Sequence, residues 1–206
     1  MMRILVTAGP TREKIDPVRF ISNRSSGRMG YAIAQAAARR GCEVVLISGP
    51  VSLPAPDGVR LVKVESAAEM LDAVSSEFSA CDCLIMAAAV ADYRPAKPSV
   101  SKLKKTPGNL SLELERTVDI LAEMGRRKTA GQILVGFAAE TSDLLGYAAK
   151  KLQSKNLDFI AANYVSDGFG TSENTIHLLD KQLHDFVIGP AGKDEVARLL
   201  LEKLIG

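Results

Sequence analysis

The chain has 206 residues, of which 47% are hydrophobic, and a formal net charge of +2 at pH 7, which predicts a single globular domain over residues 1–206 with an ample core. The small net charge excludes a broad basic surface for nucleic acid, and the lack of tryptophan argues against base stacking on a strand. No apolar run approaches the roughly 20 residues that cross a bilayer, and no signal peptide precedes the first strand, so we expect a cytoplasmic protein without a membrane partner.

The sequence alternates short apolar runs with stretches of helical periodicity, which predicts a parallel sheet covered by helices on both faces. The runs expected to form strands are 3–7, 43–48, 61–64, 83–88, 133–138 and 158–162. Helices are expected over 30–40, from Ser66 onwards, over 143–155 and over 193–205, while 175–180 and 184–188 alternate like a hairpin. The predicted fold class is α/β: a Rossmann-like three-layer sandwich with a mostly parallel sheet and a C-terminal antiparallel hairpin.

The segment 23–30, NRSSGRMG, stands between the first expected strand and the first expected helix. Serine and glycine at a helix start leave backbone N–H groups bare, which suits a phosphate. The segment lacks both GxGxxG and the P-loop pattern, so it predicts a less common nucleotide site. A helix N-terminus contributes at most about 2 kcal/mol, too little for a triphosphate. We therefore expect help from Lys102, Lys151 and Lys155, each of which has a solvated surface role as its alternative.

Two stretches interrupt the alternation of strands and helices. Residues 10–22 form a connection longer than the usual two to six residues, and a loop of that length at a strand end commonly builds a site. Residues 94–109 are rich in proline, serine and lysine, and we expect them to form a mobile flap. The sequence KLKK at 102–105 gives this flap the densest positive charge in the chain.

Small and polar residues follow the later strands. The alanines at 87–89 would let a ligand lie against the backbone, and Asp92 would contact that ligand or its metal; close helix packing is the alternative for the alanines. Phe137 would cover a base or ribose, or else belong to the core. Asn23 offers an amide to a developing oxyanion, although asparagine also favours helix N-caps.

The three cysteines, Cys42, Cys81 and Cys83, cannot build a disulfide framework, and the two histidines lie far from them in sequence. We expect reduced, buried thiols rather than a metal site. The sequence identifies no metal ligands.

Six blocks of the sequence together resemble the bacterial phosphopantothenoylcysteine synthetases of coenzyme A biosynthesis: 7–11, 16–23, 25–27, 87–93, 102–105 and 136–141. The resemblance implies a ligase in which the carboxylate of 4′-phosphopantothenate attacks the α-phosphate of CTP, with Mg²⁺, to give an acyl-cytidylate and pyrophosphate. The amine of cysteine then displaces CMP. The resemblance also implies a homodimer, either free-standing or fused to a flavin-dependent phosphopantothenoylcysteine decarboxylase.

The same resemblance assigns roles to individual residues. Asn23 would stabilise the acyl-nucleotide, the flap residue Lys102 would help to form it, and Arg19 would reach the phosphopantothenate of the neighbouring subunit. Asn23, Ala87, Ala88 and Asp92 would line the substrate. The nucleotide site that it implies consists of Gly9, Ser25, Gly27, Gly30, Met86, Ala87, Ala88, Asp92, Lys102, Val118, Asp119, Ile120, Phe137, Lys151, Lys155 and Asn163.

One position departs from the family pattern. Many bacterial members have Asn-Pro-Asp-Ile before a helix, whereas this chain has Thr-Val-Asp-Ile at 117–120. Val118 therefore removes the preset φ that proline gives a helix start.

Two other classes of function remain as alternatives. An NAD(P)-dependent oxidoreductase needs a ribose-reading side chain after its second strand, where this chain has Ser48-Gly49-Pro50. A non-catalytic scaffold would leave Asn23 and the flap lysines without a purpose.

Overall fold

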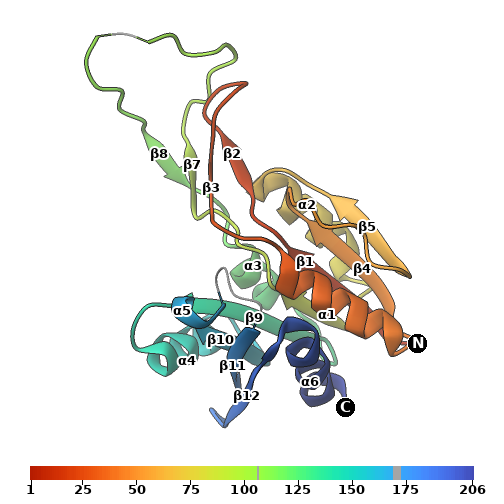
Figure 1. The fold of residues 1–206 in the computed structure, drawn as a ribbon. Helices are drawn as coiled ribbons and strands as arrows, with labels where there is room; N and C mark the ends of the chain where they lie inside the picture. The colour runs from red at the N-terminus through yellow and green to blue at the C-terminus, as the bar shows by residue number, and fades with distance from the viewer. Residues whose placement is uncertain (106, 169–172) are drawn as a thin grey trace.

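An eight-stranded sheet forms the centre of the computed structural model, which describes residues 1–105, 107–168 and 173–206. Its strand order is β12-β11-β10-β9-β6-β1-β4-β5 (Figure 1). All neighbouring strands from β5 to β10 are parallel, whereas β11 is antiparallel to both of its neighbours, β10 and β12. The α/β prediction, with its mostly parallel sheet and C-terminal hairpin, is therefore confirmed. The strands are β1 (Arg3–Ala8), β4 (Glu43–Ser48), β5 (Val59–Lys63), β6 (Cys83–Met86), β9 (Ile133–Glu140), β10 (Phe159–Tyr164), β11 (Glu173–Asp180) and β12 (Asp185–Gly192).

Helices cover both faces of this sheet. Helices α1 (Arg28–Arg39) and α6 (Lys193–Ile205) pack on one face, and α2 (Ala67–Phe78), α3 (Ile120–Arg127) and α4 (Leu144–Ser154) pack on the other. A short turn, α5 (Val165–Gly168), follows β10. Ile4 and Val6 of β1 belong to the core under α1 and α6, whereas Leu5 belongs to the opposite core. Burial on both sides explains why the strands read as unbroken apolar runs.

The element boundaries follow the sequence signals closely. Ser66 caps α2, because its side chain accepts a hydrogen bond from the Glu69 amide at 3.2 Å. Helix α1 ends at Arg39, Arg40 is its C-cap, and Gly41 follows in the left-handed region with φ 78°. The strand expected over 83–88 ends early, at Met86, and the residues after it enter a loop. The expected hairpin is longer than predicted, with strands over 173–180 and 185–192.

Two antiparallel arms project from the body of the molecule (Figure 1). One pairs β2 (Arg12–Lys14) with β3 (Phe20–Ser22), and the other pairs β7 (Tyr93–Pro95) with β8 (Leu114–Arg116). The stretch 10–22, expected to be a plain connection, is thus mostly a hairpin. Its three-residue strands are too short to show a two-residue period. The expected flap begins in β7, and its Ser99 amide donates to the Ile15 carbonyl at 2.8 Å, which ties the two arms together.

Gly30 lets α1 approach the end of β1. A Cβ atom built on Gly30 would lie 2.6 Å from the Ala8 Cβ and 2.9 Å from the Thr7 carbonyl oxygen. The helix therefore starts directly above the carboxyl end of a central strand. Its N-cap is Gly27, whose φ of 74° is left-handed, and no side chain caps the first amides. These amides remain open toward the edge of the sheet.

Replacing Gly30 with alanine tests this close approach. A glycine-to-alanine change inside a helix normally stabilises the protein by about 1 kcal/mol. Here the added methyl group overlaps β1, so we expect Gly30→Ala to lower the free energy of unfolding by about 1–3 kcal/mol in urea titrations. A variant more stable than the wild type would show that the helix does not sit this close to the strand.

Candidate functional site

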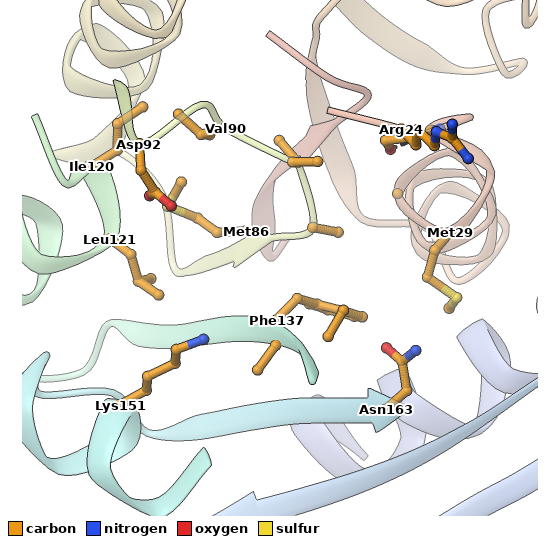
Figure 2. A pocket seen from close by; sticks show the side chains of 18 of the residues that line it. Arg24, Met29, Met86, Val90, Asp92, Ile120, Leu121, Phe137, Lys151 and Asn163 are labelled. Atoms are coloured by element: carbon orange, nitrogen blue, oxygen red, sulfur yellow. Dashed lines mark hydrogen bonds between the residues drawn. The ribbon is translucent and has the colours of Figure 1, made fainter. Parts of the chain in front are cut away.

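A cavity of about 860 Å³ opens at the carboxyl ends of the central strands (Figure 2). Its walls come from the residues before and within the first turn of α1, the loop after β6, the start of α3, and the ends of β9 and β10. The chain runs from β1 outward to β5 and then returns to β6 on the other side of β1. Ligands of open α/β sheets bind at such a reversal of strand order, which makes this cavity the candidate site.

Most of the residues predicted to bind a nucleotide line this one cavity. They come from six separate parts of the chain and include a half-buried aromatic ring, Phe137, at the centre of the view in Figure 2. The predicted residues in the lining are Ser25, Gly27, Gly30, Met86, Ala87, Ala88, Asp92, Val118, Asp119, Ile120, Phe137, Lys151, Lys155 and Asn163.

Gly9 and Asn23 lie just outside the lining and support it. A Cβ on Gly27 would lie 3.3 Å from the Gly9 nitrogen, so these two glycines pack backbone against backbone. Asn23 does not cap α1. Its Nδ2 donates to the carbonyl oxygens of Ala89 at 3.2 Å and Val90 at 3.1 Å, both of which line the cavity. Asn23 therefore links the segment before α1 to the loop after β6.

Arg19 and Lys102 are not brought to the cavity within this chain. The Arg19 guanidinium binds the buried carboxylate of Asp16 and donates to the Leu103 carbonyl at 3.1 Å. The same Asp16 carboxylate accepts from the Leu103 amide at 3.1 Å. The Arg19 guanidinium, together with three backbone amides, holds the pKa of Asp16 well below its usual range. Lys102 directly precedes Leu103, whose backbone is held by Asp16 and Arg19, and its side chain is exposed.

The two predicted lysines at one end of the cavity already have carboxylate partners. Lys151 pairs with Glu140 at 2.7 Å, and Lys155 pairs with Asp119 at 2.9 Å. Burial raises the pKa of Asp119, but the hydrogen bonds from Lys155 and from the Ala122 amide outweigh it, so this pKa lies below its ordinary value. The positive charge at this end is therefore largely balanced before any ligand arrives.

The missing proline does not affect the start of α3. Asp119 is the N-cap, and its carboxylate accepts from the Ala122 amide at 3.0 Å. Val118 precedes the cap and lies outside the helix. The expectation that Val118 removes a preset helical φ was wrong, because that residue is not the first helical one.

Sequence reasoning missed a second group of polar residues in the cavity. Arg24 and Arg28 lie in the NRSSGRMG segment, of which only the backbone N–H groups were predicted to bind phosphate. Asn174 and Lys193 come from β11 and the start of α6, far from that segment in sequence. Only the topology of the C-terminal hairpin brings them to the cavity, so no local pattern could have identified them. Ala89, expected to lie against a ligand as part of the alanine run at 87–89, also lines the cavity. The lining residues whose side chains were not predicted are Arg24, Ser26, Arg28, Met29, Val90, Thr117, Leu121, Ala138, Ala139, Asn174 and Lys193.

The described residues contain no group of three or more histidine, cysteine, aspartate or glutamate side chains that could hold a metal ion. Asp92, however, is an exposed carboxylate in the lining of the cavity. Mg²⁺ usually takes one or two protein carboxylates together with substrate phosphates and water. Asp92 fits that kind of shared site.

The cysteines play no part in the cavity lining. Cys81 and Cys83 are buried free thiols, as expected, whereas Cys42, also a free thiol, is only half-buried. Burial raises the pKa of the Cys81 thiol to about 11, which leaves it protonated and unreactive near neutral pH. Among the described residues, no helix combines the length and the apolar character that a membrane crossing requires.

Comparison with known proteins agrees with the family suggested by the sequence. A family model described as the DNA/pantothenate metabolism flavoprotein C-terminal domain matches residues 1–206. The Coenzyme A biosynthesis bifunctional protein CoaBC of Bacillus subtilis (strain 168) is 49% identical over 205 residues, which cover 98% of this chain and 50% of that protein. The chain thus spans about half the length of the curated relatives it matches.

Two solved structures share the whole fold. The C-terminal domain of a Coenzyme A biosynthesis bifunctional protein CoaBC superposes with a TM-score of 0.85 at 47% identity, covering 98% of this chain and 93% of that one. The DNA/pantothenate metabolism flavoprotein from Streptococcus pneumoniae gives a TM-score of 0.85 at 27% identity, covering 98% of each chain. The chain belongs to the family of DNA/pantothenate metabolism flavoprotein C-terminal domains.

Proposed function

We propose that this domain is a phosphopantothenate–cysteine ligase of coenzyme A biosynthesis that uses CTP. The observation that carries the proposal is the single cavity that gathers the nucleotide-binding residues expected from the sequence around the open first turn of α1. Relatives named for coenzyme A biosynthesis support the pathway. The choice of CTP over ATP rests on the resemblance of the opening blocks and the KLKK segment to bacterial synthetases.

The proposed reaction has two steps. A carboxylate oxygen of 4′-phosphopantothenate attacks the α-phosphorus of CTP, the bond to the β-phosphate breaks, and pyrophosphate leaves. The amine of L-cysteine then attacks the acyl carbon of the acyl-cytidylate, loses a proton, and CMP leaves with the electrons of the broken bond. Neither step needs a nucleophile from the protein, so its work is positioning and charge neutralisation.

The residues of the cavity divide this work between them. The amides at the start of α1 offer donors to phosphate oxygens, and the small residues Ala87 and Ala88 allow close approach to the backbone. Phe137 gives an apolar surface for the nucleoside. Asn23 holds the Ala89–Val90 carbonyls in place and lies beside the path of the acyl group. Asp92 would hold Mg²⁺ together with the nucleotide phosphates, and the ion would supply positive charge to the reacting phosphate.

A homodimer completes the proposed site. The two arms expose apolar side chains, which include Val18, Phe20, Leu112 and Leu114. Large apolar side chains left exposed on projecting segments are candidates for a protein interface. In a dimer built through the arms, Arg19 and Lys102 would serve a cavity that they do not reach within their own chain. Fusion to a flavin-dependent decarboxylase and a cytoplasmic location belong to the same proposal.

An activity assay that measures each product tests the proposed function directly. With CTP, Mg²⁺, 4′-phosphopantothenate and cysteine, we expect one pyrophosphate and one CMP for each amide formed, measured by chromatography. With cysteine omitted, pyrophosphate should appear only in a burst equal to the number of active sites. Nucleotide binding without pyrophosphate release would favour a scaffold, and oxidation or reduction of NAD(P) would favour an oxidoreductase.

Replacing Lys102 with glutamine separates the chemistry from binding. We expect Lys102→Gln to lower the rate of pyrophosphate release by about 100-fold or more, because it removes a cation from the developing charge. The affinity for CTP, measured by calorimetry, should change less than about twofold, since the proposed role of Lys102 is to stabilise charge that develops only in the transition state. Lys104→Gln, an equally exposed change in the same segment, is the matched control. Equal rates for the two variants would remove Lys102 from the mechanism.

Replacing Asn23 with aspartate tests the link between the two cavity loops. The new carboxylate would face the Ala89 and Val90 carbonyl oxygens without a proton to donate, and it would repel phosphoryl oxygens. We expect turnover to fall about 100-fold while the protein still unfolds cooperatively in thermal circular dichroism. Asn109→Asp makes the same change at an exposed position of the arm. Turnover equal to that of this control would contradict a role for Asn23.

A further inference from the structure

The cavity has a second cationic end that the predicted lysines do not provide. Arg24 and Met29 lie at one end of the view in Figure 2, and Lys151 points in from the other. Arg28 and Lys193 line the cavity with Arg24. In the part of the chain that the structure describes, neither Arg24 nor Arg28 forms an ion pair with a carboxylate. The charges of Arg24 and Arg28 are thus left uncompensated, unlike those of Lys151 and Lys155.

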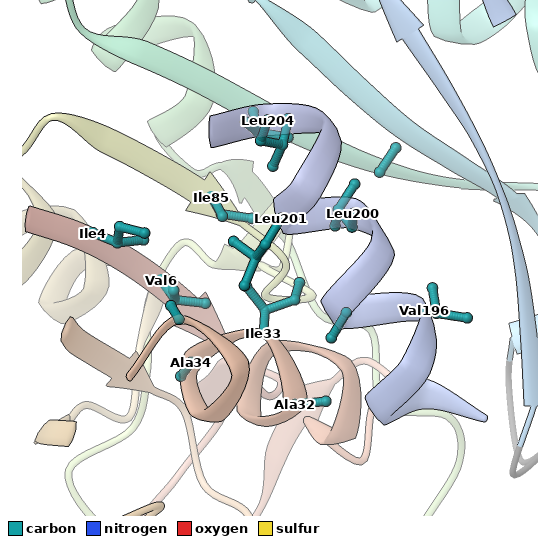
Figure 3. Packing of buried hydrophobic residues seen from close by; sticks show 14 of the residues in the cluster. Ile4, Val6, Ala32, Ile33, Ala34, Ile85, Val196, Leu200, Leu201 and Leu204 are labelled. Atoms are coloured by element: carbon teal, nitrogen blue, oxygen red, sulfur yellow. The ribbon is translucent and has the colours of Figure 1, made fainter. Parts of the chain in front are cut away.

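The packing of α6 on α1 places Lys193 beside Arg28. Leu200 and Leu201 of α6 lie over Ile33 of α1 in the core (Figure 3). Both helices begin at the cavity, so their first residues share its wall. The Lys193 ammonium lies 3.5 Å from the Glu173 carbonyl oxygen. Burial lowers the pKa of Lys193, and the nearby charge of Arg28 lowers it further. An anion held by both side chains would offset this repulsion.

Asn174 provides an independent sign that this end is built for a ligand. It pairs with Ala191 in the hairpin, next to the start of α6, and also lines the cavity. Only 5% of Asn174 is exposed, yet its Oδ1 has no hydrogen-bond partner among the described residues. Buried amide groups are nearly always hydrogen-bonded, because an unmade bond is costly. A half-turn of this carboxamide presents either an acceptor or an NH₂ group to a ligand.

We propose that Arg28, Lys193 and Asn174 form the subsite for the terminal phosphates of the nucleotide and for the pyrophosphate that leaves. This inference rests on the proposed function, and it assigns the charge of the ligand to one end of the cavity. The balanced pairs of Lys151 and Lys155 then face the less charged nucleoside. Arginine, lysine and a helix N-terminus together are well suited to a polyphosphate.

Calorimetric titration with CTP, CMP and inorganic pyrophosphate tests the subsite. For Lys193→Gln we expect the affinities for CTP and for pyrophosphate to fall about tenfold or more, because a charge-assisted contact is lost. The affinity for CMP, which lacks the terminal phosphates, should change less than twofold. Lys203→Gln, an exposed change in the same helix, is the matched control and should leave all three affinities unchanged. Arg28→Gln should reproduce the pattern, which covers the case in which Lys193→Gln fails to fold.

The outcomes separate this inference from the proposed function. If the wild type binds CTP but both variants weaken CTP and CMP equally, or weaken neither, the subsite is overturned and the nucleotide function stands. If the wild type binds pyrophosphate but not CTP, and Lys193→Gln abolishes that binding, the subsite stands and the nucleotide function is overturned. A wild type that binds neither compound overturns both.

Discussion

The close contact between Gly30 and the end of β1 is the constraint on which the rest of the site depends. Because no side chain intervenes, the first turn of α1 lies directly above the edge where the parallel strands end. The loop after β6 and the ends of β9 and β10 reach the same edge, since their strands are parallel to β1. Backbone donors and small side chains thus meet in one place, before any charged group is considered.

The electrostatics of the cavity follow from which elements reach each end. The lysines of α4 meet the carboxylates of Glu140 and Asp119, which belong to β9 and to the cap of α3. Arg24 and Arg28, near the start of α1, share their end of the cavity with Lys193 from α6, and neither arginine pairs with a carboxylate of the described residues. A ligand with one neutral and one strongly anionic part fits this gradient in a single orientation. If the proposed function is right, this gradient would orient the nucleotide as well as attract it.

Sequence patterns were sufficient to predict the central sheet and four of its helices for physical reasons, although not α3, while most of the cavity residues came from the family resemblance. Strands buried on both faces leave unbroken apolar runs, and Ser66 and Gly41 mark helix ends by local capping chemistry. Met86 and Phe137 lie in the C-terminal halves of β6 and β9, so their place near this edge of the sheet follows from the parallel topology. The β2–β3 hairpin was missed because its strands are too short to show a period. Asn174 and Lys193 were missed because only tertiary packing brings them to the site.

The cavity is complete only when α6 packs on α1, because α6 supplies part of its wall. Contacts between residues so far apart in sequence as Arg28 and Lys193 carry an entropic cost of loop closure. Until α6 docks, Ile33 and its neighbours on α1 remain uncovered and the cavity lacks one wall. A chain interrupted before α6 would therefore lack Lys193 in the cavity wall and would expose the apolar face of α1, the kind of surface that chaperones and proteases recognise.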